Sequence, residues 1–288
     1  MRLARSTAVK AGVTWCAVGR LAGAQLPGVA VDPHMVVLTP ARPAGEITVF
    51  NPRPFASEFT VDLRFGYVTT DSSGAPVVEL KDGPDSVSAA EWITPYPRKF
   101  SLAPGAAQLV RLLAHPPATL ADGEYWARLT VHSHDVTAGR TVGVTSGADT
   151  TRAALTLETA TVMPIFFRKG AVATGISIER LAAVRDGDSI DVSMSLRRAG
   201  NSAFLGVARV AVLDSTGHEL AATERKLAVY VASATRWRVP LPPSLRASAR
   251  TVTVALSTLR RDVPTRLVLQ AATVRQQAPL ISPFVPPH

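Results

Sequence analysis

The sequence is poor in cysteine, in aromatic residues and in helical patterns, and each shortage excludes a class of structure. Its 288 residues include a single cysteine, Cys16, so the chain cannot form an internal disulfide and must be held together by its apolar core. Aromatic residues make up only 6% of the chain, and Trp237 with Tyr230 gives little support for stacking on nucleobases. Few windows repeat apolar residues at helical spacing, which excludes a mainly helical fold.

The first 24 residues are typical of a secretory signal peptide. They carry four basic residues and no acidic one, a short apolar stretch, and the small residues Ala22-Gly23-Ala24, which match an A-x-A cleavage site before Gln25. The alternative is a disordered basic tail. Because Cys16 lies inside this segment, the mature chain would hold no thiol. No other segment approaches the roughly 18 apolar residues of a membrane-spanning helix, so we expect a periplasmic protein without a transmembrane segment.

The net charge of +9 is distributed unevenly along the chain. Residues 25–168 hold 11 basic and 14 acidic residues, a balance of −3, whereas residues 169–288 hold 16 basic and 8 acidic residues, a balance of +8. The arginines of the second half alternate through the expected strands and would form a basic face. Because few aromatic residues accompany it, such a face favours anionic surfaces or acidic clients over nucleic acid, or serves solubility alone.

Short runs of alternating apolar and polar residues, separated by turn residues, dominate both halves of the chain. Such runs predict half-buried strands, about seven in each half. We therefore predict an all-β fold with two Ig-like β-sandwich domains in tandem after the signal peptide. The predicted parts are the signal peptide (residues 1–24), the first sandwich (25–168), the second sandwich (169–275) and an extended, proline-rich tail (276–288).

The segment LTLETATVMPIFFRKG, residues 155–170, combines a strand pattern with a feature of sheet edges. Leu155, Leu157 and Thr159 recur at every second position, and Pro164 cannot donate a ladder hydrogen bond, which favours an edge strand. The backbone of an edge strand can pair with an incoming strand, and regularly spaced leucines can fill its apolar slots. The alternative is that both leucines point into the core of their own domain.

Several spaced motifs of the first half occur in a fixed order. They are VDPHMVVLTPARPAGEITVFN (31–51), RKFSLAPGAAQLVRLL (98–113), LADGEYWARLTV (120–131) and IFFRKG (165–170). In this order they resemble the N-terminal domain of the PapD-like family, the periplasmic pilus-assembly chaperones, over most of residues 29–168. The resemblance implies two Ig-like sandwiches set at an angle, with a cleft between them that holds a client subunit.

The resemblance implies a binding mode and partners. Leu155, Leu157 and Thr159 match the strand that the family lends to an incomplete client sandwich, which is donor-strand complementation. The implied partners are secreted pilus-like subunits or other β-sandwich proteins, together with an outer-membrane usher. The implied function is that of a chaperone rather than an enzyme, and it requires no cofactor.

Three charged residues match those that join the two domains in the family. They are Glu124, Arg168 and Asp262. A guanidinium held between two carboxylates fixes an interdomain angle better than an apolar contact would, because the pairing is bidentate and directional. Apart from Asp262, the second half of the chain shows no match to the family.

Two positions depart from the family pattern. Its members hold the C-terminal carboxylate of a client with an arginine in the first strand and a lysine in the long strand, and the matching positions here are Met35 and Pro164. Neither side chain can bind a carboxylate. We therefore expect a different anchor or a different kind of client. The alternative function is that of a secreted structural or adhesive tandem β-sandwich protein without chaperone activity.

Motifs for catalysis or metal binding are weak. His132 and His134 share one face of an expected strand, with Asp135 beside them, but no third set of ligands has a recognisable spacing. Nucleophile elbows, zinc-protease motifs and phosphate-binding glycine loops are absent from the sequence. We therefore expect neither a metal site nor catalysis.

Overall fold

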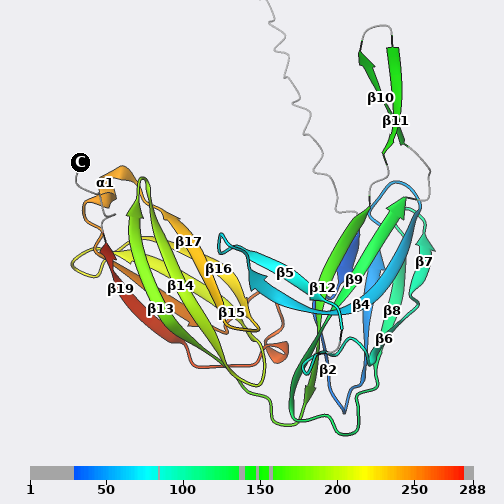
Figure 1. Ribbon diagram of the computed structural model, residues 1–288, viewed down its shortest axis with the longest axis horizontal. Coiled ribbons are helices and arrows are strands. Elements are labelled where there is room, and N and C mark those ends of the chain that lie inside the picture. Colours follow the sequence, from blue (N-terminus) through cyan, green and yellow to red (C-terminus); the bar gives the residue numbers. More distant parts are fainter. Residues whose placement is uncertain (1–28, 84, 136–139, 147–148, 156–157, 282–288) are drawn as a thin grey trace, which may run out of the picture.

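The computed structural model describes residues 29–281 apart from 84, 136–139, 147–148 and 156–157, and for 135 and 140–155 it describes the backbone alone. The described chain is built from strands, with only the short turns α1 (Pro243–Arg246) and η1 (Thr265–Leu267) as helical elements. The strands form two β-sandwiches side by side (Figure 1). The predicted all-β tandem fold is therefore confirmed.

The first sandwich has two layers. One layer has the strand order β1-β3-β8-β6 and contains β1 (Ala30–Asp32), β3 (Ala44–Phe50), β8 (Ala107–Ala114) and β6 (Ile93–Tyr96). The other has the order β2-β12-β9-β4-β5, with β7 paired to β4. Its strands are β2 (Val36–Leu38), β12 (Thr159–Lys169), β9 (Gly123–Asp135), β4 (Ser57–Thr70), β5 (Pro76–Lys81) and β7 (Lys99–Leu102).

Buried and exposed side chains alternate along the strands, and the buried ones form an apolar core between the two layers. In β8, Val110, Leu112 and Ala114 are buried while the residues between them face solvent. Together with Phe59 and Phe167, which are also fully buried, they belong to one continuous apolar cluster between the layers. Burial of large apolar side chains is the main stabilising contribution in a chain without disulfides.

The apolar run near the start of the described chain contributes to both layers. β1 pairs antiparallel with β3, and β2 pairs parallel with β12. The chain therefore crosses from one layer to the other between Pro33 and Met35, a division that simple alternation did not predict.

A separate hairpin projects from the end of the first sandwich (Figure 1). It consists of β10 (Arg140–Ser146) and β11 (Asp149–Leu155), which among the described strands pair with each other and with no third strand. Leu155 lies opposite Arg140 at the base of this hairpin.

The second sandwich is one continuous set of seven strands in the order β16-β15-β18-β19-β13-β14-β17. The strands are β13 (Thr174–Asp186), β14 (Ser189–Gly200), β15 (Phe204–Leu213), β16 (Glu219–Val229), β17 (Ser233–Pro240), β18 (Thr251–Ser257) and β19 (Val274–Ile281). β19 joins the two layers because it pairs antiparallel with β18 and parallel with β13. The apolar core of this sandwich includes Ile190, Phe204 and Val212.

The prediction of an extended tail from residue 276 is wrong for residues 276–281. These residues complete β19, and Ala278 is buried between the neighbouring strands. The prolines of the segment obscured its alternation, although Pro279 is accommodated on the exposed side of β19. Residues 282–288 and the predicted signal peptide lie outside the described residues. In the described part of the chain, no helix has the length and hydropathy needed to cross a membrane.

The two sandwiches meet through a shared apolar cluster. Tyr230, which follows β16, is almost fully buried and lies against three rings of the first sandwich, those of Tyr67, Trp126 and Phe166. Its ring centroid is 4.9 Å from that of Trp126, edge to face, and 6.2 Å from that of Phe166 in a stacked arrangement. Edge-to-face and stacked rings are directional contacts, so this cluster restrains the relative orientation of the sandwiches.

Candidate functional site: the interdomain cleft and the edge of β12

An ion pair lies where the two sandwiches meet. Glu124 and Arg168 stand directly opposite each other in the antiparallel pair of β9 and β12. The Arg168 Nε donates a hydrogen bond of 2.8 Å to Glu124 Oε2. The Glu124 side chain is fully buried, so this is a charge-assisted bond in a region of low dielectric constant.

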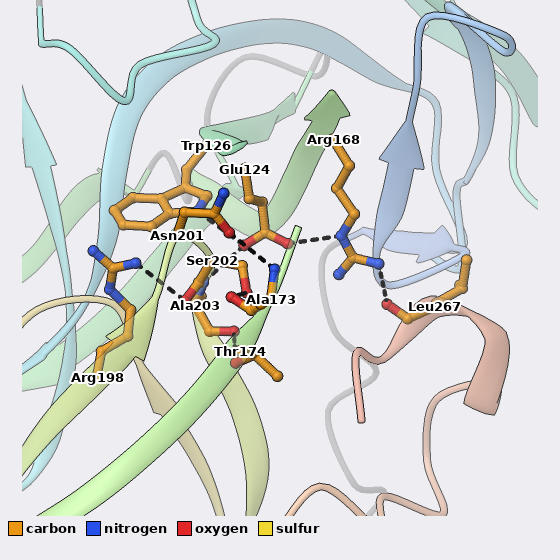
Figure 2. A network of polar contacts seen from close by, with 10 residues as sticks. All are labelled: Glu124, Trp126, Arg168, Ala173, Thr174, Arg198, Asn201, Ser202, Ala203 and Leu267. Carbon is orange, nitrogen blue, oxygen red and sulfur yellow. Dashed lines mark hydrogen bonds and ion pairs between the residues drawn. The ribbon is translucent and has the colours of Figure 1, made fainter. Parts of the chain in front are cut away.

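Both partners of this ion pair also contact the second sandwich (Figure 2). Glu124 Oε1 accepts hydrogen bonds from the Trp126 indole (3.0 Å) and from the backbone N–H of Ala203 (2.9 Å). The Arg168 Nη1 donates to the carbonyl oxygen of Leu267 (2.9 Å). The Glu124 carboxylate and the Arg168 guanidinium therefore each link the first sandwich to the second.

Asp262 is not part of this tie, and its predicted role is corrected. Its carboxylate instead pairs with Arg260 (2.5 and 2.9 Å) and with Lys226 (2.8 Å). The Arg260 guanidinium holds the pKa of Asp262 well below its usual range. The second acceptor for Arg168 is the Leu267 carbonyl in the η1 turn, a backbone group that side-chain motifs cannot reveal.

One edge of β12 is partly open. Along one side, β9 pairs with the whole of Thr159–Lys169, whereas on the other side β2 pairs only with Ile165–Phe167. In the described part of the chain, no strand pairs with that other side of β12 between Thr159 and Pro164. Pro164 thus lies in the open stretch, where a missing N–H costs least.

The three predicted client-binding residues fall at or before the start of this stretch. Leu157 lies outside the described residues, and Leu155 is described only by its backbone in β11. Thr159 is half-buried. Its hydroxyl accepts a hydrogen bond from Arg53 Nη2 (3.0 Å) and contacts the hydroxyl of Ser133 (2.8 Å).

The open stretch borders a cavity between the sandwiches. The cavity measures about 600 Å³, and Val162 and Pro164 of β12 contribute to its wall. Met35 lines the same cavity. The structure therefore brings the two departing positions, Met35 and Pro164, to one place, and neither provides a positive charge there.

Arg128 is a residue of this cavity that the sequence analysis missed. It lies on β9 directly opposite Pro164 of β12 and is only 3% exposed. Its Cζ atom lies 4.9 Å from the ring centroid of Tyr230. Arg128 shares a face of β9 with Glu124 and Trp126, opposite the core side chains Ala127 and Leu129, so the alternation of GEYWARLTV gave no signal that it is buried.

His132 and His134 belong to a polar cluster near the start of β12. Their rings are stacked at 6.4 Å, and His132 Nδ1 lies 3.1 Å from a carboxylate oxygen of Glu158. His132 Nε2 also lies 3.4 Å from Asp62. Among the residues that the structure describes, no group of three or more His, Cys, Asp or Glu side chains could hold a metal ion.

This chain is similar to known proteins in its structure and not detectably in its sequence. No protein-family model matches the sequence, and no curated protein matches it. The E. coli chaperone DraB is 14% identical with a TM-score of 0.41, over 88% of this chain and 96% of that chain. The Pseudomonas aeruginosa CupB2 chaperone is 10% identical with a TM-score of 0.42, over 87% and 100%.

A third similar structure comes from the CsuC-CsuE chaperone-tip adhesion subunit pre-assembly complex of Acinetobacter baumannii Csu pili. It is 10% identical with a TM-score of 0.43, over 88% of this chain and 98% of that chain. The chain is similar to these three chaperone structures over most of its length at low sequence identity.

Proposed function

We propose that the protein is a periplasmic chaperone that binds incomplete β-sandwich subunits by lending them the open edge of β12. The observation that carries the proposal is the unequal pairing of β12: β9 follows its whole length, and β2 covers the other side only at Ile165–Phe167. Unpaired N–H and C=O groups along a strand edge are the groups to which an incoming strand adds.

The side chains of the open stretch suit this role. Ala160 and Val162 are exposed, while Met163 packs into the core of the first sandwich. The strand is thus anchored on one face and presents apolar groups on the other. In the same proposal, Leu155 and Leu157 occupy apolar slots of the client just before β12 begins.

The proposed clients are secreted pilus-like subunits or other β-sandwich proteins that lack a strand. A subunit with a missing strand exposes apolar surface and open sheet edges, which promote aggregation. Adding a strand from the chaperone covers both. An outer-membrane usher that receives the loaded chaperone is the second proposed partner.

Hydrogen exchange tests strand addition directly. A short strand-forming peptide of alternating valine and threonine is added to the mature chain, and backbone amide exchange is measured with and without it. We expect slower exchange within Thr159–Pro164 and no change within β8, which has a partner on each side. Equal exchange of Thr159–Pro164 in both samples would contradict the proposal.

Variants then test the role in client capture. Proteins that co-purify with the chain from the periplasm are identified by mass spectrometry, and capture is repeated with Leu157→Arg and Ala160→Arg. Both variants are expected to lose the β-sandwich client because a charge is placed along the donated strand. Leu109→Arg is the matched control, since Leu109 is exposed on β8 of the other layer. Unchanged capture by both variants would favour the structural or adhesive alternative.

A further inference from the structure

A second cavity lies between the tip of the β4–β5 hairpin and the strands β16 and β17, which end the layers of the second sandwich (Figure 1). It measures about 480 Å³, a volume typical of small-molecule sites. The hairpin contributes residues 68–70 and 73–76 to its wall, and β16 and β17 contribute residues 225–228, 233 and 235–238. Among the described residues, none of β12 lines it, so this cavity is separate from the edge that a client would pair with.

The tip of the hairpin is fixed against β17 by hydrogen bonds. The Thr235 hydroxyl donates to the carbonyl oxygen of Gly74 (2.8 Å) and accepts a hydrogen bond from the Trp237 indole (3.0 Å). The indole N–H is thereby satisfied, so the ring of Trp237 gives the cavity an apolar surface. Within the turn, the Asp71 carboxylate accepts hydrogen bonds from the N–H (2.8 Å) and the hydroxyl (2.6 Å) of Ser73, and Asp71 does not line the cavity.

The charges of the cavity wall are mostly positive. The charged residues of the wall, among those described, are Arg225, Lys226, Arg236, Arg238 and Asp191. Arg238 Nε donates to the Asp191 carboxylate (3.0 Å). Lys226 Nζ lies 2.8 Å from a carboxylate oxygen of Asp262. Neither Arg225 nor Arg236 forms an ion pair with a described side chain. The cavity therefore contains two guanidinium groups whose charge is not compensated by the protein.

These two arginines come from the two strands that border the cavity. Arg225 lies on β16, with its Cζ atom 5.2 Å from the ring centroid of Trp237. Arg236 lies on β17, next to the tip of the hairpin. The aromatic face stabilises a cation in part, but the N–H groups in the plane of a guanidinium stay available for an acceptor. Because both side chains line one cavity, an anion placed there meets donors from both strands.

The rest of the wall indicates what kind of anion fits. Apolar residues line it together with the Trp237 ring, namely Val68, Ala75, Pro76, Leu227 and Ala228. Small-molecule sites commonly combine apolar walls with a few polar groups that orient the ligand. A phosphate monoester carries a charge of about −1.5 to −2 and three acceptor oxygens. It therefore matches two guanidinium groups better than a carboxylate does, and its organic body can contact the apolar wall.

We propose that this cavity binds a phosphate monoester with an apolar or ring-bearing body, and that Arg225 and Arg236 hold the phosphate. The site goes beyond the proposed chaperone function and does not depend on strand addition, since it shares no wall with β12 among the described residues. A soluble ester and a phosphorylated lipid headgroup present the same chemical group. Because the ligand would contact both sandwiches, its binding also favours their present arrangement.

Calorimetry with phenyl phosphate tests the class of ligand. Its affinity for the mature chain is compared with those of inorganic phosphate and benzoate at equal ionic strength. Phenyl phosphate is expected to bind at least about tenfold more tightly than either, because only this probe offers both the phosphate and an apolar ring. Benzoate that binds as tightly as phenyl phosphate overturns the choice of phosphate. Phenyl phosphate that does not bind overturns the site.

Arginine variants test the residues that hold the phosphate. Arg225→Gln and Arg236→Gln are each expected to weaken phenyl phosphate binding at least about tenfold, since each removes charge-assisted hydrogen bonds. Arg209→Gln is the matched control, because Arg209 is an exposed arginine of the second sandwich that pairs with Glu219 and does not line the cavity. Arg225 and Arg236 are exposed, so both variants are expected to melt like the native chain. Unchanged affinity in both variants overturns the assignment.

A variant that keeps every charge separates a built cavity from general attraction to a basic surface. Gly74→Ala brings a Cβ atom to 2.3 Å from the backbone nitrogen of Arg236 and so displaces the hairpin tip that forms one wall. It is expected to weaken phenyl phosphate binding. Gly83→Ala is the control because no atom lies within 4 Å of its added Cβ, and it is expected to bind like the native chain. Full affinity in Gly74→Ala overturns the cavity as the binding site.

Vesicles distinguish the two sources of the phosphate. The native chain and Arg225→Gln are sedimented with phosphatidylcholine vesicles that contain phosphatidic acid, a lipid with a phosphate monoester. Cosedimentation of the native chain that is lost in Arg225→Gln assigns a lipid headgroup. No cosedimentation, with phenyl phosphate binding intact, assigns a soluble ester. Cosedimentation that Arg225→Gln retains reflects the net charge of the chain and overturns the lipid as the source.

Discussion

The carbonyl oxygen of Gly74 accepts a hydrogen bond of 2.8 Å from the hydroxyl of Thr235, across the two sandwiches. Gly74 lies in the turn between β4 and β5, and Thr235 lies on β17. The φ angle of Gly74 is +82°, and a Cβ atom there would lie 2.3 Å from the backbone nitrogen of Arg236. The tip of this hairpin therefore contacts the second sandwich at a position that only glycine fits (Figure 1).

Substitution of this glycine is expected to weaken the contact between the sandwiches. Gly74→Ala adds both backbone strain, about 1–2 kcal/mol, and a collision with Arg236. Gly83→Ala is the control because Gly83 has a similar φ of +91° and no atom within 4 Å of the added Cβ. Urea unfolding is expected to show a larger loss of stability for Gly74→Ala, and amide exchange at Arg236 is expected to speed up in that variant alone. Equal losses in the two variants would mean that the contact contributes nothing.

The buried ion pair at the junction is expected to contribute far more to stability than an exposed one. Glu124→Gln leaves the Arg168 guanidinium without a countercharge at a nearly buried position, for which losses of about 3–5 kcal/mol are typical. Glu219→Gln breaks the exposed pair with Arg209 and is expected to cost less than about 1 kcal/mol. Thermal unfolding of both variants checks the contrast. Similar losses would contradict the burial argument.

Acid is expected to remove the contribution of Asp262. Arg260 lowers the pKa of Asp262 below its ordinary value of 3.8, so folding is favoured by the ionised form. This contribution is complete above pH 3.8 and is lost as the pH falls toward the lower folded-state pKa. The melting temperatures of the native chain and of Asp262→Asn are therefore expected to differ at neutral pH and to converge at acid pH. A difference that stays constant with pH would refute this assignment.

The last described strand is expected to be essential to the second sandwich. Ala278→Asp places a carboxylate at a buried position in β19 between β18 and β13, and a buried unpaired charge is strongly destabilising. Gln277→Asp is the control because Gln277 is exposed on the same strand. Circular dichroism and amide exchange are expected to show loss of the second sandwich in Ala278→Asp only. A fully folded Ala278→Asp would mean that β19 contributes little to closure.

Much of the fold could be predicted because alternation and turn residues are local signals. The run that contains Val110 and Leu112 forms a strand with those side chains buried, as its pattern requires. The crossing between β1 and β2 and the inclusion of Ala278 in β19 could not be predicted in the same way. Both depend on which sheet a short segment joins, and that is decided by long-range pairing.

At the interdomain junction, the sequence predicted the contact between two side chains but not the contact between a side chain and the backbone. Glu124 and Arg168, each named from a motif, lie together, whereas Asp262 does not join them, because Arg168 uses the backbone carbonyl of Leu267. Arg128 was missed for a different reason. An arginine in an alternating run is read as exposed, and only the packing of Tyr230 against it reveals its burial.

The position of β19 also sets an order of events for a chain that emerges from its N-terminal end. The strands of the first sandwich are complete once Lys169 has emerged, whereas the second sandwich lacks the strand that joins its layers until Ile281 is available. Domains of this size fold as units, earlier ones first. The open edge of β12 is thus formed while the second sandwich is still unfolded, and the cleft beside it is completed last.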